Sequence, residues 1–240
     1  MPAEHALCGD FLLRHAAAGG VVVNYNPLYV ERELRHAIED SGTEIMITMD
    51  LALIYPKVAR VAAATGLRKL VVCSMAGSLP RLKGLLFPLV RRRDVAAIAT
   101  DARTIRYEAL IRNDGRIAPV AIDPGDTAIL QYTGGTTGVP KAAELTHANI
   151  TSNCAQVIDG MGLNNLGQER VMGVLPLFHV FALTTVMILS VRTASLMILV
   201  PRSISTIRWR RSRAPARRCS PPCPRSTRCW SKLPRAARSI

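Results

Sequence analysis

Short apolar runs and segments with helical spacing alternate along most of the chain. The β-branched run VVVNY occupies residues 21–25, and residues 31–41 then place Leu34 and Ile38 four positions apart among charged side chains. Alternation of strand-length runs with amphipathic segments is typical of strands separated by helices. The pattern predicts an α/β fold with a mostly parallel sheet flanked by helices.

The same pattern continues as far as residue 201. Further strands are expected at 45–49, 69–74, 127–133, 171–176 and 195–201, and further helices at 51–64, 147–160 and 179–190. Residues 75–123 are less regular, and the basic run Arg91-Arg92-Arg93 is interpreted as a solvated turn rather than a membrane-contact patch. Residues 181–200 are strongly apolar, but Arg192 and several Ser and Thr residues interrupt them. A buried helix and a strand are therefore favoured there over a membrane span.

The charge of the chain is concentrated at one end. The formal net charge is +14, yet residues 202–240 contain 12 of the 31 Lys and Arg residues and none of the 17 Asp and Glu residues. The first 201 residues are thus nearly neutral, and 49% of the chain is hydrophobic, which is enough for a core. No specific nucleic-acid partner is expected for this body.

Residues 203–240 allow three interpretations. A basic arm would bind nucleic acid or anionic lipid through its Arg and Trp side chains. A zinc site would use the three cysteines of this segment, but their spacing closes no CxxC pair. The third interpretation, which we favour, is translation out of frame, and a disordered basic tail ranks next, ahead of a binding arm. Arg202–Thr206 can be encoded as CGT-TCG-ATA-TCG-ACN, and the same bases read from the third position encode Phe-Asp-Ile-Asp.

A loop rich in Gly and Thr follows the strand expected at 127–133. The sequence YTGGTTGVPK, residues 132–141, combines three glycines, three threonines and a lysine. Glycines let backbone N–H groups approach a ligand closely, Thr hydroxyls add donors, and Lys141 adds positive charge. This combination predicts a polyphosphate site. It is not a Walker A loop, because Pro140 precedes the lysine and Ala142 follows it.

Three ordered motifs carry a family resemblance. The segment LQYTGGTTGVPK…LTHANI resembles the phosphate-binding signature of AMP-forming acyl-CoA synthetases, in the adenylate-forming superfamily. Together with PLFHVFALT (176–184) and NYNPLY (24–29), it is particularly similar to bacterial long-chain fatty-acid–CoA ligases. The resemblance covers about residues 19–202, whereas residues 1–18 match poorly. It implies that 1–202 form part of an N-terminal AMP-binding domain.

The resemblance also implies the chemistry. Such ligases form an acyl-adenylate from ATP and a fatty acid and then an acyl-CoA, with ATP, Mg²⁺ and CoA as cofactors. His179 becomes a candidate for the acyl and adenylate pocket, and no Mg²⁺ ligand is assigned. By resemblance, the residues around the β- and γ-phosphates are Thr133, Gly134, Gly135, Thr136, Thr137, Gly138 and Lys141.

Some features depart from the family pattern. Ala142 replaces the usual Gly, and Glu144 puts an anion near the expected phosphate site unless it points outward. The segments that carry the Mg²⁺-binding Glu, the ribose-binding Asp and the C-terminal domain with its adenylation lysine do not occur. We therefore expect a truncated, inactive ligase fragment. The alternatives are a catalytically dead ATP-binding module and a basic-tail binder of nucleic acid or membrane.

The cysteines of the body indicate the compartment. Cys8, Cys73 and Cys154 are scattered, which is typical of reduced thiols and predicts a cytoplasmic location. The resemblance leaves peripheral contact with the inner membrane face open.

Overall fold

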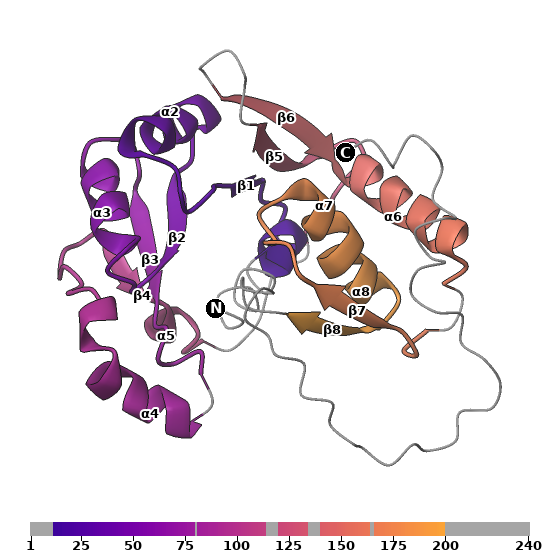
Figure 1. Ribbon diagram of the computed structural model, residues 1–240. Coiled ribbons are helices and arrows are strands. Elements are labelled where there is room, and N and C mark those ends of the chain that lie inside the picture. Colours follow the sequence, from indigo (N-terminus) through magenta and orange to yellow (C-terminus); the bar gives the residue numbers. More distant parts are fainter. Residues whose placement is uncertain (1–11, 80, 114–119, 134–139, 164–165, 200–240) are drawn as a thin grey trace.

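A computed structural model of the chain describes residues 12–79, 81–113, 120–133, 140–163 and 166–199 (Figure 1). Its strands form three groups. They are β1 (Val22–Asn24), β5 (Thr127–Thr133) and β6 (Lys141–Thr146); β2 (Ile45–Met49), β3 (Lys69–Cys73) and β4 (Thr104–Arg106); and β7 (Arg170–Gly173) with β8 (Leu196–Leu199). Only β5 and β6 pair antiparallel among the described strands. The expected α/β class with mostly parallel pairing is confirmed.

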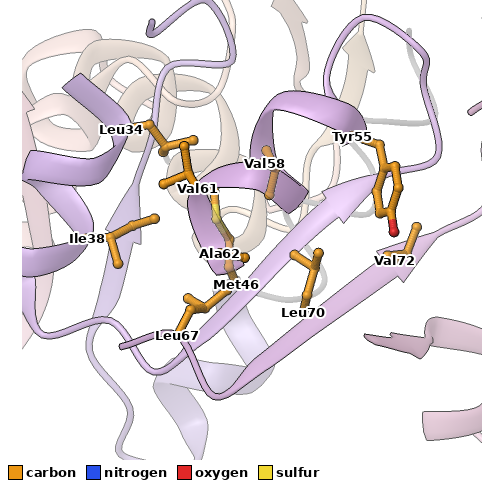
Figure 2. Close-up of a cluster of buried hydrophobic side chains, with 10 residues drawn as sticks. All are labelled: Leu34, Ile38, Met46, Tyr55, Val58, Val61, Ala62, Leu67, Leu70 and Val72. Carbon is orange, nitrogen blue, oxygen red and sulfur yellow. The ribbon is translucent and has the colours of Figure 1, made fainter. Parts of the chain in front are cut away.

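Two helices cover one face of the β2–β3–β4 sheet. Helices α2 (Glu31–Ser41) and α3 (Tyr55–Ala63) place their apolar faces against the strands, and Figure 2 shows the side chains meeting between them. This core consists of Leu34, Ile38, Met46, Tyr55, Val58, Val61, Ala62, Leu67, Leu70 and Val72. Burial of these side chains supplies the main stabilisation of this lobe.

Helix α2 has the bounds that its periodicity predicts, and local interactions set both ends. At the start, the Glu33 carboxylate accepts a hydrogen bond from the Val30 backbone N–H at 3.0 Å. At the end, Gly42 adopts φ of +63°, a left-handed conformation that residues with a side chain rarely adopt. Its N–H bonds to the Ile38 carbonyl, so the helix stops there.

A second core lies beneath β5 and β7. It is formed by α6 (His147–Met161) and by a continuous helical stretch made of α7 (Val180–Ala182), the π-helical segment Leu183–Ile188 and α8 (Leu189–Arg192). The helix expected at 179–190 is therefore present, with a π-helical middle that periodicity did not reveal. The fully buried members of this core include Ile129, Leu177, Leu183 and Met187.

Two parts of the sequence analysis need correction. Residues 141–146 form β6, whereas we had expected the loop to lead to the helix at 147 without a strand. The stretch 75–123 also contains regular structure: α4 (Arg81–Val90), a 3₁₀ helix (Arg92–Asp94), β4 and α5 (Tyr107–Leu110). Residues 203–240 lie outside the described residues. None of the described helices is long and apolar enough to cross a bilayer.

Replacing the buried Ile38 tests the core between α2 and β2. Ile38 is 2% exposed, so Ile38→Ala leaves a cavity and should lower the free energy of unfolding by about 2–5 kcal/mol. Leu53, which is 83% exposed, is the control, and Leu53→Ala should change the free energy of unfolding by less than about 0.5 kcal/mol. Urea unfolding measures both. Equal shifts for the two variants would contradict this packing.

Candidate functional site

The carboxyl ends of two parallel strands form the base of the site. β1 and β5 run in the same direction, with Asn24 opposite Gln131. Asn24 is buried and Gln131 is half-buried. In open α/β sheets ligands bind beyond such strand ends, so the loop that follows β5 leaves the sheet at the expected place.

Gln131 connects the three motifs that the sequence analysis singled out. The Asn24 Nδ2 donates to Gln131 Oε1 at 3.4 Å, and Gln131 Nε2 donates to the carbonyl oxygen of Phe178 at 3.1 Å. Each contact joins segments that are distant in the sequence. One amide side chain thus holds the NYNPLY and PLFHVFALT segments against the strand that carries the Gly-rich loop.

Tyr132 joins the same strand to α2. Its hydroxyl donates to Asp40 Oδ2 at 2.6 Å and also lies 3.2 Å from the Ala37 carbonyl oxygen. Its ring stacks on Tyr25 with centroids 6.3 Å apart. Burial, and secondly the hydrogen bond with Asp40, raise the pKa of Tyr132 well above its ordinary value. The phenol is therefore neutral at physiological pH and donates to the carboxylate.

The described ends of the loop face each other as a cross-strand pair. Thr133 and Lys141 are opposite residues of β5 and β6, and the Thr133 hydroxyl donates to the Lys141 carbonyl at 3.2 Å. Both side chains are exposed. His36 of α2 lies against the same loop end, its Nε2 donating to the Pro140 carbonyl at 3.3 Å. The expected phosphate residues Gly134, Gly135, Thr136, Thr137 and Gly138 lie outside the described residues.

The carboxylate of Glu144 is held away from the loop. Glu144 pairs with Leu130 in the β5–β6 ladder, and its carboxylate accepts a hydrogen bond from the Thr127 hydroxyl. Thr127 is the first residue of β5 and the loop follows the last, Thr133. At about 3.4 Å per residue, six steps of strand separate these ends by roughly 20 Å. Glu144 thus points outward, which removes the electrostatic conflict that its position in the sequence raised.

His179 lies immediately before α7, next to Phe178, whose carbonyl accepts the hydrogen bond from Gln131. Its side chain is exposed, and its ring centroid is 4.5 Å from that of Phe178. Its backbone N–H donates to the Pro176 carbonyl at 3.1 Å, which fixes the turn before the helix. His179 is thus the residue directly after Phe178, whose carbonyl binds Gln131. Its role in an acyl pocket stays a prediction.

The described residues near the loop do not fit a resident metal site. Mg²⁺ prefers oxygen ligands and is usually bound by one or two carboxylates together with substrate phosphates. Here Asp40 accepts from Tyr132 and Glu144 from Thr127. Within the described ranges, no three His, Cys, Asp or Glu side chains cluster in a way that could hold a metal ion. We therefore treat Mg²⁺ as a companion of the nucleotide.

Sequence reasoning missed several residues of this arrangement. Asn24 and Gln131 were quoted only as letters of their motifs, although polar residues at the ends of two parallel strands are a usable signal. Asp40 and His36 lie on the polar side of an ordinary amphipathic helix. Nothing in the sequence distinguishes them from solvated charges, because their partners Tyr132 and Pro140 come about a hundred residues later.

The chain is similar to known proteins over most of its length. Residues 15–211 match the family described as AMP-binding enzyme. A long-chain-fatty-acid–CoA ligase of Bacillus subtilis is 38% identical over 193 residues, covering 77% of this chain and 33% of that protein. One from Escherichia coli O157:H7 is 39% identical over 197 residues, covering 78% and 34%. The chain spans about a third of the length of these relatives.

Solved structures show the same fold. The crystal structure of ATP-bound MatB from Rhodopseudomonas palustris superposes with a TM-score of 0.56 at 24% sequence identity. The superposition covers 82% of this chain and 33% of that one. At this identity the likeness establishes the fold.

Removal of the Tyr132 hydroxyl tests the bond between the loop strand and α2. Tyr132→Phe keeps the ring stack on Tyr25 but loses the hydrogen bond to Asp40, so the free energy of unfolding should fall by about 1 kcal/mol. Tyr29→Phe is the matched control, because no hydrogen bond of the Tyr29 hydroxyl to another described residue is found. Chemical denaturation compares the two. A loss no larger for Tyr132→Phe than for the control would contradict the role of this bond.

The raised pKa of Tyr132 makes stability depend on alkaline pH. Its ordinary pKa is 10.0 and the folded value is higher, so folding favours the protonated phenol. The resulting stability is fully present below pH 10 and is lost as the pH rises through the folded pKa. We expect the unfolding midpoint to fall above pH 10, and less steeply in Tyr132→Phe. Urea midpoints over an alkaline pH series measure this, and identical slopes in both proteins would refute it.

Proposed function

The chain belongs to the AMP-binding enzyme family, and from this premise we propose that it supplies the ATP phosphate-binding part of a long-chain fatty-acid–CoA ligase. The observation that carries the proposal is the convergence of three motifs at Gln131 and Tyr132, directly below the Thr133–Lys141 pair. The substrate class follows the names of the relatives at 38–39% identity.

The reaction that we propose for the complete enzyme has two steps. A fatty-acid carboxylate oxygen attacks the α-phosphorus of ATP, the bond to the β-phosphate oxygen breaks, and acyl-adenylate and pyrophosphate form. The thiolate of CoA then attacks the acyl carbon, and AMP leaves with the bonding electron pair. Both steps bring anions together, so the protein must hold polyphosphate by fixed donors and positive charge.

The residues of this chain are suited to the phosphate part of that task. Lys141 places a cation at the exposed mouth of the hairpin, next to the loop of Gly and Thr residues. The Thr133 hydroxyl closes the base of the loop by donating to the Lys141 carbonyl. A phosphate contact of Thr133 would therefore come from its backbone N–H or require this bond to open. We assign the β- and γ-phosphates to residues 133–138 and Lys141.

His179 is proposed for the other side of the site. Its segment is held by Gln131, whose strand leads into the phosphate loop, so a ligand spanning both would have its phosphates at the loop and its acyl end toward 178–179. The exposed imidazole beside Phe178 offers a polar and an aromatic surface. We propose that it lines the acyl-adenylate pocket and assign it no proton transfer.

For the 240 residues alone we propose ATP binding without turnover. The matched segment covers only about a third of the relatives that carry the ligase name, and the described part of this chain contains no cluster of three His, Cys, Asp or Glu side chains that could hold a metal ion. We also propose a cytoplasmic location. In support, the described cysteines Cys73 and Cys154 are free thiols, as is usual in a reducing compartment.

Replacement of Lys141 tests the proposed phosphate site most directly. Loss of one charge-assisted contact to phosphate should weaken ATP binding roughly 10- to 100-fold in Lys141→Ala. Lys69→Ala removes the same charge from an exposed position on β3 and should leave the affinity unchanged. Isothermal titration calorimetry of the full chain with Mg-ATP measures both.

Three outcomes would count against the proposal. ATP that fails to bind the unaltered chain would refute the phosphate site, and equal affinities of the two lysine variants would refute the role of Lys141. Acyl-adenylate formed by the 240 residues from ATP and palmitate would refute binding without turnover.

A further inference from the structure

Helix α4 turns a continuous apolar face toward solvent. Leu82, Leu85 and Leu89 are 72–77% exposed, and Leu86 is 46% exposed. Their positions follow the spacing i, i+3, i+4 and i+7, which places them on one side of the helix. In most helices such a face is buried in the core. Here it forms the outer surface of the β2–β3–β4 lobe.

The opposite side of α4 is fixed to the protein. Gly84 lies so close to the preceding turn that an added Cβ would meet the Ala76 carbonyl oxygen at 2.4 Å. One turn later, Phe87 packs against the buried cluster of Met49, Cys73 and Met75. Gly84 and Phe87 thus determine the rotation of the helix, and this rotation points the four leucines outward.

Basic residues surround this face. Lys83 lies within α4, and Arg91, Arg92 and Arg93 follow its last residue; all four are exposed. Residues 81–94 contain five basic side chains and one acidic side chain, Asp94, which pairs with Arg91 at 3.4 Å. The sequence analysis favoured a solvated turn at 91–93 over a membrane contact, but exposure is common to both. The sequence did not reveal that the turn adjoins an exposed apolar face.

We propose that this surface, formed by α4 and Arg91–Arg93, docks the protein on an anionic lipid bilayer. The leucines would enter the boundary between headgroups and acyl chains, and the arginines would contact lipid phosphates. An amphipathic helix lying in the interface binds through apolar burial together with attraction to anionic lipid. The basic residues favour an anionic bilayer over other partners. Its acyl chains complement the exposed leucines, and its phosphates complement the cations beside them.

The location of α4 leaves the candidate site accessible. In Figure 1, α4 lies at the end of its lobe remote from α2 and from the β5–β6 hairpin. Docking through α4 would not cover the loop between Thr133 and Lys141. The inference does not depend on ATP binding and would hold if the phosphate site failed its own test.

Hydrogen exchange of the full chain locates the contact. Vesicles of phosphatidylglycerol and phosphatidylcholine should slow exchange in peptides that span 81–93, whereas vesicles of phosphatidylcholine alone should have a much smaller effect. Peptides from α6 should not change. Because the positive charge of the segment 203–240 would also attract anionic lipid, its peptides are followed in the same experiment.

A pair of matched variants separates apolar docking from general attraction. Leu85→Asp/Leu89→Asp should reduce salt-resistant binding to anionic vesicles at least tenfold. Leu53→Asp/Leu166→Asp adds the same charge at two leucines that are 83% and 70% exposed, and should reduce it much less. Vesicle flotation at high salt measures the binding, because charge attraction is screened there. Unchanged exchange of core peptides confirms that both variants are folded.

Four results would overturn the proposal. The first is equal flotation of the two double variants. The second is protection by anionic vesicles that is confined to 203–240. The third is equal protection of 81–93 by neutral and anionic vesicles, which would remove the role of the arginines. The fourth is concentration-dependent protection of 81–93 without vesicles, which would show that a second copy of the chain covers this face.

Discussion

The amide of Gln131 is the contact on which the site depends. A side-chain amide has both a donor and an acceptor, and here the acceptor takes a hydrogen bond from the buried Asn24 while the donor binds the Phe178 carbonyl. Asn24 and Gln131 are 107 positions apart. Neither partner would easily find a substitute, since a buried polar group without a partner destabilises the fold. The parallel register of β1 and β5 makes this contact possible, and the loop, α2 and α7 take their places around it.

The sequence predicted an element well where its apolar residues followed a regular helical or strand spacing. The bounds of α2 and β5 are as predicted, because Leu34, Ala37 and Ile38 give a clear helical period and TAILQYT is a long apolar run. Strand β6 was missed because KAAELT is poor in β-branched residues, and pairing with β5 decides its conformation instead. The chemistry of the loop was readable from Gly, Thr and Lys alone. Its attachment through Asp40 and His36 was not, because it depends on tertiary contacts.

Helices α2 and α4 show why spacing does not determine burial. In α2 the core-facing positions 34, 37 and 38, with the half-buried Ser41 after them, follow the same i, i+3, i+4, i+7 spacing as 82, 85, 86 and 89 in α4. The first set faces the core or its edge, whereas the second faces solvent. The difference lies on the opposite side of each helix. α2 carries charges there, while α4 carries Gly84 and Phe87, which fit tightly against the lobe and set its rotation.

The electrostatics of the loop follow from where the carboxylates are held. A polyphosphate site is weakened if acidic side chains share it; Asp40 lies on α2, which contacts the hairpin through Tyr132, and Glu144 lies on β6 within the hairpin. Each is committed to a hydroxyl: Asp40 to Tyr132 and Glu144 to Thr127, at the far end of β5. These hydrogen bonds give each carboxylate a donor and also fix where its negative charge lies. Neither of these two carboxylates is therefore bonded to Lys141, and this favours the positive potential that a nucleotide requires at the loop end.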